Sequence, residues 1–156
     1  MLESFATRTL LPIMLRFALA VVFIYHGLEK VHPENSYGFK WATPKPSPAD
    51  KATDPAAQAQ ELLPAPLQGL VAWGELLGGV AIALGILTRV AALGIIVIMV
   101  GAIVTVTGAG GFSEMNKGFE YNFVLIAVAL SLIITGAGTF SLDRVIKVKM
   151  RGPAKY

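Results

Sequence analysis

Residues 66–111 read PLQGLVAWGELLGGVAIALGILTRVAALGIIVIMVGAIVTVTGAGG, and this stretch decides the fold. Its first half, Pro66–Leu87, is apolar apart from Gln68 and Glu75, and its second half, Val90–Gly111, has no charged residue. Each half is close to the ~20 residues that a helix needs to cross a ~30 Å hydrocarbon core. A two-residue Thr-Arg turn separates the halves. We therefore predict two consecutive transmembrane helices.

Two further apolar stretches flank this pair. Leu11–Leu28 is interrupted by Arg16 and His26, and Tyr121–Thr139 has no charge. Strand-like alternation is absent, so a membrane barrel does not fit. The first stretch could instead be a cleaved signal peptide, but no small-residue cleavage site follows it. We predict an all-α integral membrane four-helix bundle in one domain, with helices over about 9–31, 66–88, 90–111 and 120–139.

The composition supports a membrane protein and excludes several kinds of chemistry. Of the 156 residues, 54% are apolar and 15% are charged, whereas a soluble domain has about 25% charged residues. The absence of cysteine excludes thiol chemistry, iron–sulfur clusters and thiolate zinc on this chain. The two histidines are poorly spaced for a metal, so no metal site is predicted. The net charge of +3 comes from a short tail and does not indicate nucleic-acid binding.

The basic residues predict the orientation. The tail 143–156 has five basic residues and one acid, Asp143. The positive-inside rule then places both termini in the cytoplasm of a bacterial-type inner membrane. The tail also suits contact with anionic lipids.

A long Pro-rich loop, 32–65, joins the first two helices on the outer side. It holds six of the nine prolines. Asp54 and Pro55 form a helix start, which predicts a short helix over 54–63. The loop could be a tolerated insertion, or it could have a function as a lid over the outer mouth of the bundle or as a docking surface.

Glycine spacing predicts where the helices meet, because small residues allow helices to pack closely in lipid. A G-x-x-x-G pattern lies in the second helix, and glycines recur every seven residues in the third. The predicted packing positions are Gly74, Gly78, Gly79, Gly94, Gly101 and Gly108.

Two charges are predicted to lie deep in the membrane. A lone carboxylate such as Glu75 is costly there and usually has a partner. Helical rise places Arg16 within reach of it from the first helix. The sequence therefore predicts a buried ion pair of Arg16 with Glu75. Glu75 could also act as a proton-carrying or quinone-facing carboxylate.

Polar residues gather at the outer end of the predicted bundle, where any small-molecule pocket is expected. His26 and Glu75 are the candidate catalytic residues, although His26 could equally be an interfacial histidine capped by Glu29. The predicted outer-half pocket consists of His26, Lys30, Trp73, Glu75 and Glu120.

Several of these residues form patterns that resemble the DoxX family over nearly the whole chain. The matching elements are Arg16, His26-Gly27-x-x-Lys30, Glu75-x-x-Gly78-Gly79, Gly85-x-x-Thr88-Arg89, Glu120 and Ser141-Leu-Asp143. The resemblance implies a four-helix inner-membrane protein, from a family linked to thiosulfate:quinone oxidoreductase and other membrane redox assemblies. The Pro-rich stretch 40–66 departs from the family's compact outer loop.

Two functions follow as hypotheses. The first is a membrane subunit of a quinone-linked redox complex, with no covalently bound cofactor, with quinone or lipid as its ligand and with electrons from a partner. The alternative is a non-catalytic structural subunit at the periphery of a large respiratory or photosynthetic assembly. The expected partners are membrane lipids, other membrane subunits or a second copy, and whether the chain is itself an enzyme stays open. A carrier function is disfavoured because no inverted repeat with broken helices is evident.

Overall fold

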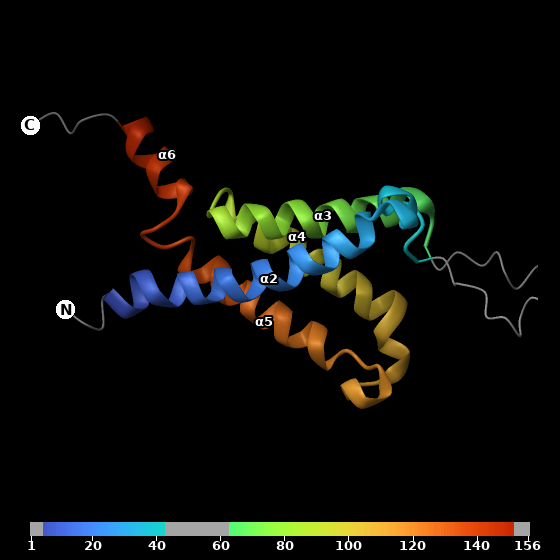
Figure 1. Cartoon of the computed structure of the whole chain (residues 1–156). Helices are drawn as coiled ribbons and strands as arrows, with labels where there is room; N and C mark the ends of the chain where they lie inside the picture. Colours follow the sequence, from blue (N-terminus) through green and yellow to red (C-terminus); the bar gives the residue numbers. More distant parts are fainter. Residues whose placement is uncertain (1–4, 43–62, 152–156) are drawn as a thin grey trace, which may run out of the picture.

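The structure is a computed structural model that describes residues 5–42 and 63–151. Within these ranges the chain is helical, with no strand. The longer helices are α2 (Leu11–Val31), α3 (Ala65–Leu84), α4 (Thr88–Ala102), α5 (Glu120–Thr135) and α6 (Leu142–Arg151) (Figure 1). Shorter helical segments are η1 (Ala6–Leu10), η2 (Pro33–Gly38), η5 (Ile103–Thr107), η6 (Gly108–Gly110) and η7 (Glu114–Asn116).

Three of the described helical stretches are long and apolar enough to cross a membrane. They are Ala6–Val31 with 26 residues, Ala65–Leu84 with 20 and Thr88–Gly110 with 23. The predicted fourth span is shorter, because α5 has 16 residues and is only about 24 Å long. It ends at Thr135 and not near residue 139. The crossing of the membrane by α5 therefore stays a prediction.

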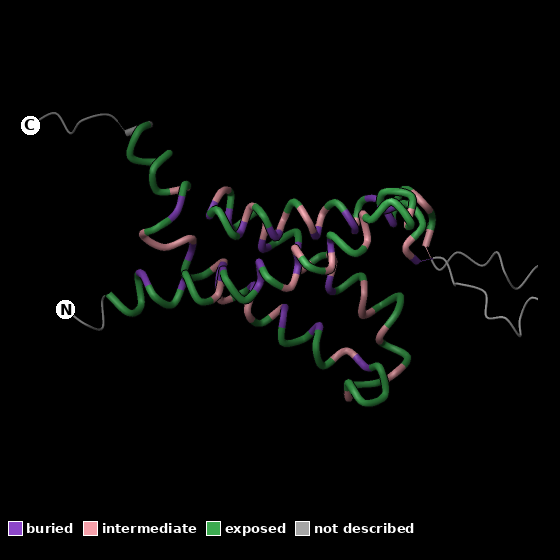
Figure 2. Tube along the Cα trace, viewed as in Figure 1, coloured by how far each residue is buried: buried purple, intermediate pink, exposed green. Residues whose placement is uncertain are grey.

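The bundle is built from two antiparallel helix pairs, α2 with α3 and α4 with α5, joined by packing of α3 on α4 and α2 on α5 (Figure 1). Its central cluster of buried apolar residues draws on all four helices. The core residues are Leu19, Ala20, Phe23, Ile82, Ala92, Ile95, Met99, Leu125, Ala129 and Leu132. The outward faces carry many exposed Leu, Val, Ile and Phe side chains. Figure 2 shows exposed residues along every helix. Soluble monomers rarely expose so much apolar area, so this surface is typical of a membrane-embedded protein.

Glycine allows α2 and α3 to approach each other closely. A Cβ at Gly79 would lie 2.9 Å from the backbone nitrogen of Ile24. The reciprocal contact comes from Gly27, where a Cβ would lie 2.5 Å from the backbone nitrogen of Leu76. Gly79 was predicted as a packing position from its spacing, whereas Gly27 was not.

The glycines of the third predicted span do not pack as expected. A Cβ at Gly94 or Gly101 would meet nothing within 4 Å, and both residues are exposed. At Gly108 the nearest atom is the carbonyl oxygen of Ile103 in the same helical stretch. The seven-residue repeat was wrong as a sign of contact inside the bundle, because the face it marks points outward. Gly74 and Gly78, in contrast, face Ile98 and Ile95 of α4.

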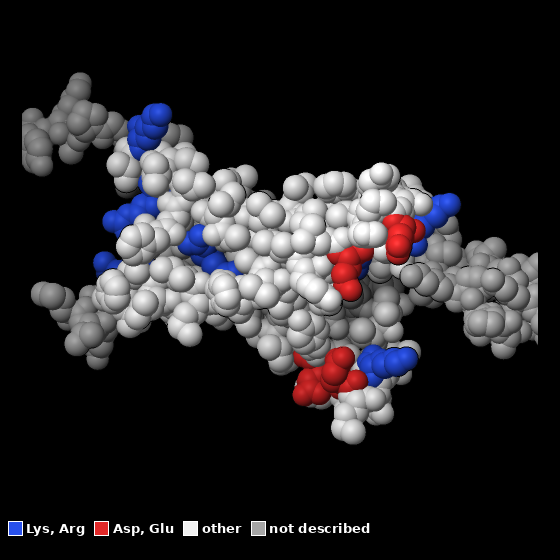
Figure 3. All heavy atoms as spheres, in the orientation of Figure 1, with Lys and Arg blue, Asp and Glu red and all other residues white. Residues whose placement is uncertain are grey.

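Two other expectations concern the loop and the tail. The short helix predicted over 54–63 falls outside the described residues except for Leu63. The basic tail contains a helix that was not predicted, α6, which projects from the bundle (Figure 1). Figure 3 shows Lys and Arg at the end of the molecule that bears α6, while the Glu side chains visible in this view lie toward the opposite end, next to further Lys and Arg.

Candidate functional site

The arginine in the first span clamps the end of the bundle that bears α6, here called the inner end after the predicted orientation, and the opposite end is called the outer end (Figure 1). Arg16 is only 8% exposed. Its Nε donates to the Ile82 carbonyl at 2.8 Å, and its Nη2 donates to the Ala83 carbonyl at 2.6 Å. Its Nη1 donates to the carbonyls of Phe140 at 2.6 Å and Ala137 at 3.2 Å. One guanidinium thus joins α2 to the end of α3 and to the segment that follows α5.

These carbonyls explain why an arginine stands at this place. The last carbonyls of a helix have no partner within the helix, and irregular backbone in a membrane must be satisfied by protein groups. A guanidinium offers five donors in a fixed fork. Gly85 provides the space, because its φ is +69° and a Cβ there would lie 2.6 Å from Ser141 Cβ and 3.0 Å from Arg16 Cζ.

The predicted pair of Arg16 with Glu75 is not formed. Arg16 is bound to carbonyls at the inner end, and Glu75 instead contacts Lys30 on the outer half of α2. Counting helical rise correctly placed both charges inside the bundle. The prediction failed because it treated a carboxylate as the natural partner and ignored the unpaired carbonyls beyond the helix ends.

Asp143 fixes the turn between α3 and α4 from the start of α6. Its carboxylate accepts hydrogen bonds from the backbone N–H groups of Leu87 at 2.7 Å and Thr88 at 3.0 Å. Its own N–H donates to the Gly85 carbonyl at 2.9 Å. Burial raises the pKa of Asp143, but the two backbone N–H groups, the Thr88 side chain and the Lys147 charge outweigh burial and hold this pKa below its ordinary value. Asp143 therefore acts as an N-terminal cap for α4 from a distant part of the sequence.

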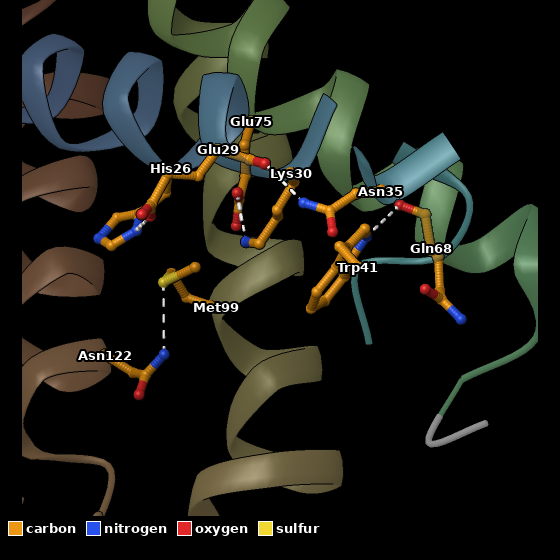
Figure 4. Close-up of polar contacts among 9 residues, drawn as sticks. All are labelled: His26, Glu29, Lys30, Asn35, Trp41, Gln68, Glu75, Met99 and Asn122. Carbon is orange, nitrogen blue, oxygen red and sulfur yellow. Dashed lines mark hydrogen bonds and ion pairs between the residues drawn. The ribbon is translucent and has the colours of Figure 1, made fainter. Parts of the chain in front are cut away.

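A second polar site lies at the outer end, between α2 and α3. The ammonium group of Lys30 donates to Oε2 of Glu75 (Figure 4). The Glu75 side chain is 4% exposed and the Lys30 side chain 20%. The indole ring of Trp41 covers the ammonium, with its centroid 4.7 Å from Nζ. This end of the bundle therefore holds a buried ion pair under an aromatic ring.

The outer loop is fastened over this pair by a buried glutamine. Gln68 of α3 is fully buried. Its backbone carbonyl accepts from Trp41 Nε1 at 2.8 Å, and its side-chain oxygen accepts from the N–H of Ala42 at 2.8 Å. Its side-chain nitrogen donates to the Leu63 carbonyl at 2.7 Å. Gln68 therefore holds the two described ends of the loop together on α3.

Other contacts also hold the first part of the loop. Asn35 Nδ2 donates to the Glu29 carbonyl at 2.8 Å, and Trp73 Nε1 donates to the Tyr37 carbonyl at 3.1 Å. These bonds place residues 33–42 as a cover on the outer ends of α2 and α3. The interpretations of the loop as an insertion, a lid or a docking surface stay predictions.

The predicted outer pocket is only partly assembled. Lys30 and Glu75 are in contact, but His26 pairs with Glu29 at 3.5 Å, as the interfacial alternative proposed. Glu120 accepts from the backbone N–H of Glu114 at 3.2 Å, within the loop before α5. Trp73 supports the loop.

Sequence reasoning missed Trp41 and Gln68. The signal was present in Gln68, a polar residue inside an apolar span, because a buried side-chain amide needs hydrogen-bond partners.

The helix pair α4 and α5 also contains a buried side-chain amide. Asn122 of α5 contacts the sulfur of Met99 at 3.4 Å and the hydroxyl of Thr107 at 3.2 Å. Figure 4 shows Asn122 and Met99 on the helices that face the Lys30–Glu75 pair.

The fold and these two sites define a class of protein, a small helical membrane protein with an arginine clamp at one end and a covered ion pair at the other. The DoxX family model matches residues 11–108. The chain therefore belongs to the DoxX family, which confirms the resemblance. An uncharacterized protein of Haemophilus influenzae is 29% identical over 136 residues, which cover 86% of this chain and 82% of that protein. No solved structure matches the chain.

Proposed function

We propose that this protein is the membrane subunit of a quinone-linked redox complex, with a quinone headgroup bound at the outer end of the bundle. The observation that carries the proposal is the buried Lys30–Glu75 pair under the Trp41 ring. Intramembrane charges are costly and usually mark functional sites.

The residues of this site fit the chemistry of a quinone headgroup. Lys30 has three N–H donors, and Glu75 is its hydrogen-bond acceptor among the described residues. A second donor of the same ammonium group suits a quinone carbonyl oxygen. Trp41 offers an aromatic surface for stacking. Glu75 is a carboxylate next to the expected carbonyl and could pass a proton there.

A quinone, when bound, supplies two-electron, two-proton redox chemistry. In this proposal the electrons come from a partner subunit, because the chain contains no cysteine for a cluster or a thiol couple. The role of this chain is to bind and orient the headgroup, to exclude water with residues 33–42, and to relay a proton through the Glu75 carboxylate.

The alternative is a structural subunit at the rim of a larger assembly. The exposed face of α4 with Gly94 and Gly101 favours this function, because small residues on an outward face allow another helix to pack closely. The Arg16 clamp is also purely structural in its contacts.

Quinone binding can be tested with the two tryptophans of the chain. A water-soluble short-chain ubiquinone is titrated into the purified full chain in mild detergent, and the quenching of tryptophan fluorescence is followed. Trp73→Phe should keep saturable quenching, since Trp41 remains at the site. Lys30→Met should raise the apparent Kd by about 10–100-fold, which corresponds to the loss of one hydrogen bond to a charged group.

The matched control is Lys40→Met, which removes an exposed lysine from the same loop. It should leave the Kd unchanged. Equal effects of the two lysine substitutions would contradict a specific site. If quenching never saturates and the protein still co-purifies with other membrane subunits in mild detergent, the structural alternative is the better one.

We also propose that the protein lies in a bacterial-type inner membrane with both termini in the cytoplasm. The gathering of Lys and Arg at the end that bears α6 supports this orientation (Figure 3). Single cysteines at Ser47 and Lys155 should label differently with an impermeant thiol reagent on intact cells. Position 47 should react and position 155 should not, and the opposite pattern would reverse the orientation.

A further inference from the structure

The helix α6 has two chemically different sides. Successive residues of a helix are 100° apart. Leu142, Val145 and Ile146 therefore fall on one side, and Arg144 and Lys147 fall on the other. Val145 is 59% exposed and Ile146 is 46% exposed. The apolar side is thus not covered by the described part of the bundle.

The start of α6 is tied to the edge of the membrane-spanning region. The N–H of Asp143 donates to Gly85, and its carboxylate accepts from Leu87 and Thr88 in the turn between α3 and α4. This turn joins two helices that are long enough to span a membrane. The first turn of α6 is therefore held at the level where the hydrocarbon core ends.

The same contacts determine the charge that α6 presents. The carboxylate of Asp143, the one acid of the helix, is engaged with backbone N–H groups. Arg144, Lys147 and Lys149 are all exposed. Their positive charge joins the other Lys and Arg side chains at this end of the molecule (Figure 3).

We propose that α6 lies in the inner membrane interface and binds the headgroups of anionic phospholipids. Amphipathic helices with a basic polar side bury their apolar side at the boundary between headgroups and acyl chains. Basic residues next to a span are attracted to anionic lipid headgroups. Lys149 falls among the apolar residues, and its long side chain can reach the headgroups from there. At this depth, the apolar side of α6 would meet acyl chains and its cations would meet headgroups. This arrangement favours lipid over an acidic protein as the partner of α6.

The chain has no cysteine, so a single introduced cysteine reports one position. Val145→Cys and Lys147→Cys variants of the full chain are labelled with bimane and placed in nanodiscs of phosphatidylcholine, with or without phosphatidylglycerol. With phosphatidylglycerol present, the probe at 145 should shift to the blue and be quenched by brominated lipid. The probe at 147 should stay accessible to aqueous iodide.

Charge variants test the headgroup contact. Removing two cations with Arg144→Gln and Lys147→Gln in the Val145→Cys background should lower the apparent affinity for phosphatidylglycerol, followed by the blue shift, by about 25-fold, or fivefold for each cation. Raising the salt to 1 M should act in the same direction, because the screening length falls to ~3 Å. Lys117→Gln, at the other end of the molecule, is the matched control and should change nothing.

Three results would overturn the proposal. The probe at 145 could be equally buried in neutral and anionic nanodiscs, which would exclude a specific contact with anionic headgroups. It could stay in water in both, which would remove the membrane contact. It could become buried only after a membrane extract containing partner proteins is added, which would make α6 a protein interface.

Discussion

Replacing Arg16 with methionine should separate the end of α3 from the segment after α5. Methionine fills part of the space of the arginine stem but has no donor for the carbonyls of Ile82, Ala83, Ala137 and Phe140. The Ile82 carbonyl keeps a hydrogen bond from the N–H of Gly85 at 3.1 Å. The other three carbonyls lose the donor that they have in the wild type.

The expected loss can be worked out from these three carbonyls. Hydrogen bonds between helices in a membrane contribute about 0.6 kcal/mol each on average and at most about 1.7 kcal/mol. Three such bonds give about 2–5 kcal/mol. Because the donor is charged and two of the bonds are 2.6 Å long, the upper part of this range is expected. We therefore predict a loss of about 4 kcal/mol for Arg16→Met.

The assay is reversible unfolding of the full chain in mixed micelles, with sodium dodecyl sulfate as the denaturant. The control is Arg8→Met, which removes an exposed arginine from the same end and should cost less than about 0.5 kcal/mol. A loss for Arg16→Met no larger than that of the control would refute the clamp. In a double-mutant cycle, Arg16→Met and Glu75→Gln should be additive within about 0.5 kcal/mol, because the residues share no partner. A large coupling free energy would instead indicate the ion pair of Arg16 with Glu75 that was predicted from the sequence.

Three further predictions use the same unfolding assay. Lys30→Met and Glu75→Leu should each cost about 3 kcal/mol, and the double variant should recover most of it because no unpaired charge is left; a double variant as unstable as the singles would contradict the pair. Asp143→Ala should cost about 1 kcal/mol at neutral pH. Because its pKa is lowered in the folded state, this contribution is present above the unfolded pKa of about 3.9 and disappears as the pH falls through the folded value, so variant and wild type should converge in acid. Gly79→Leu should destabilise the bundle, since a Cβ there lies 2.9 Å from an α2 backbone nitrogen, whereas Gly94→Leu has open space and should be tolerated.

The spans and the family could be recognised from sequence because they depend on local properties. Apolar length identifies a span without any knowledge of its neighbours. The bundle's charged contacts could not be derived in this way. Arg16 is satisfied by carbonyls far away in the sequence, and a carbonyl carries no residue-type signal because every residue has one. The unpaired carbonyls beyond α5 became visible only once the helix was seen to end at Thr135.

The glycine and tryptophan positions show the same limit. Spacing in the sequence reveals which residues share a face of a helix, but not whether that face points to a neighbour or to lipid. The periodic Gly94 and Gly101 were therefore misplaced, while the isolated Gly27 was overlooked. Trp41 lies in a Pro-rich loop, where no periodic pattern relates it to Lys30.

The arginine clamp has a consequence for how the protein is made. Arg16 enters the membrane with the first helix, whereas two of its acceptors, Ala137 and Phe140, are synthesised more than a hundred residues later. During that interval Arg16 lies near one end of the first helix, where its long side chain can reach the membrane interface. The arginine clamp can therefore be completed only after the segment that follows α5 has been synthesised.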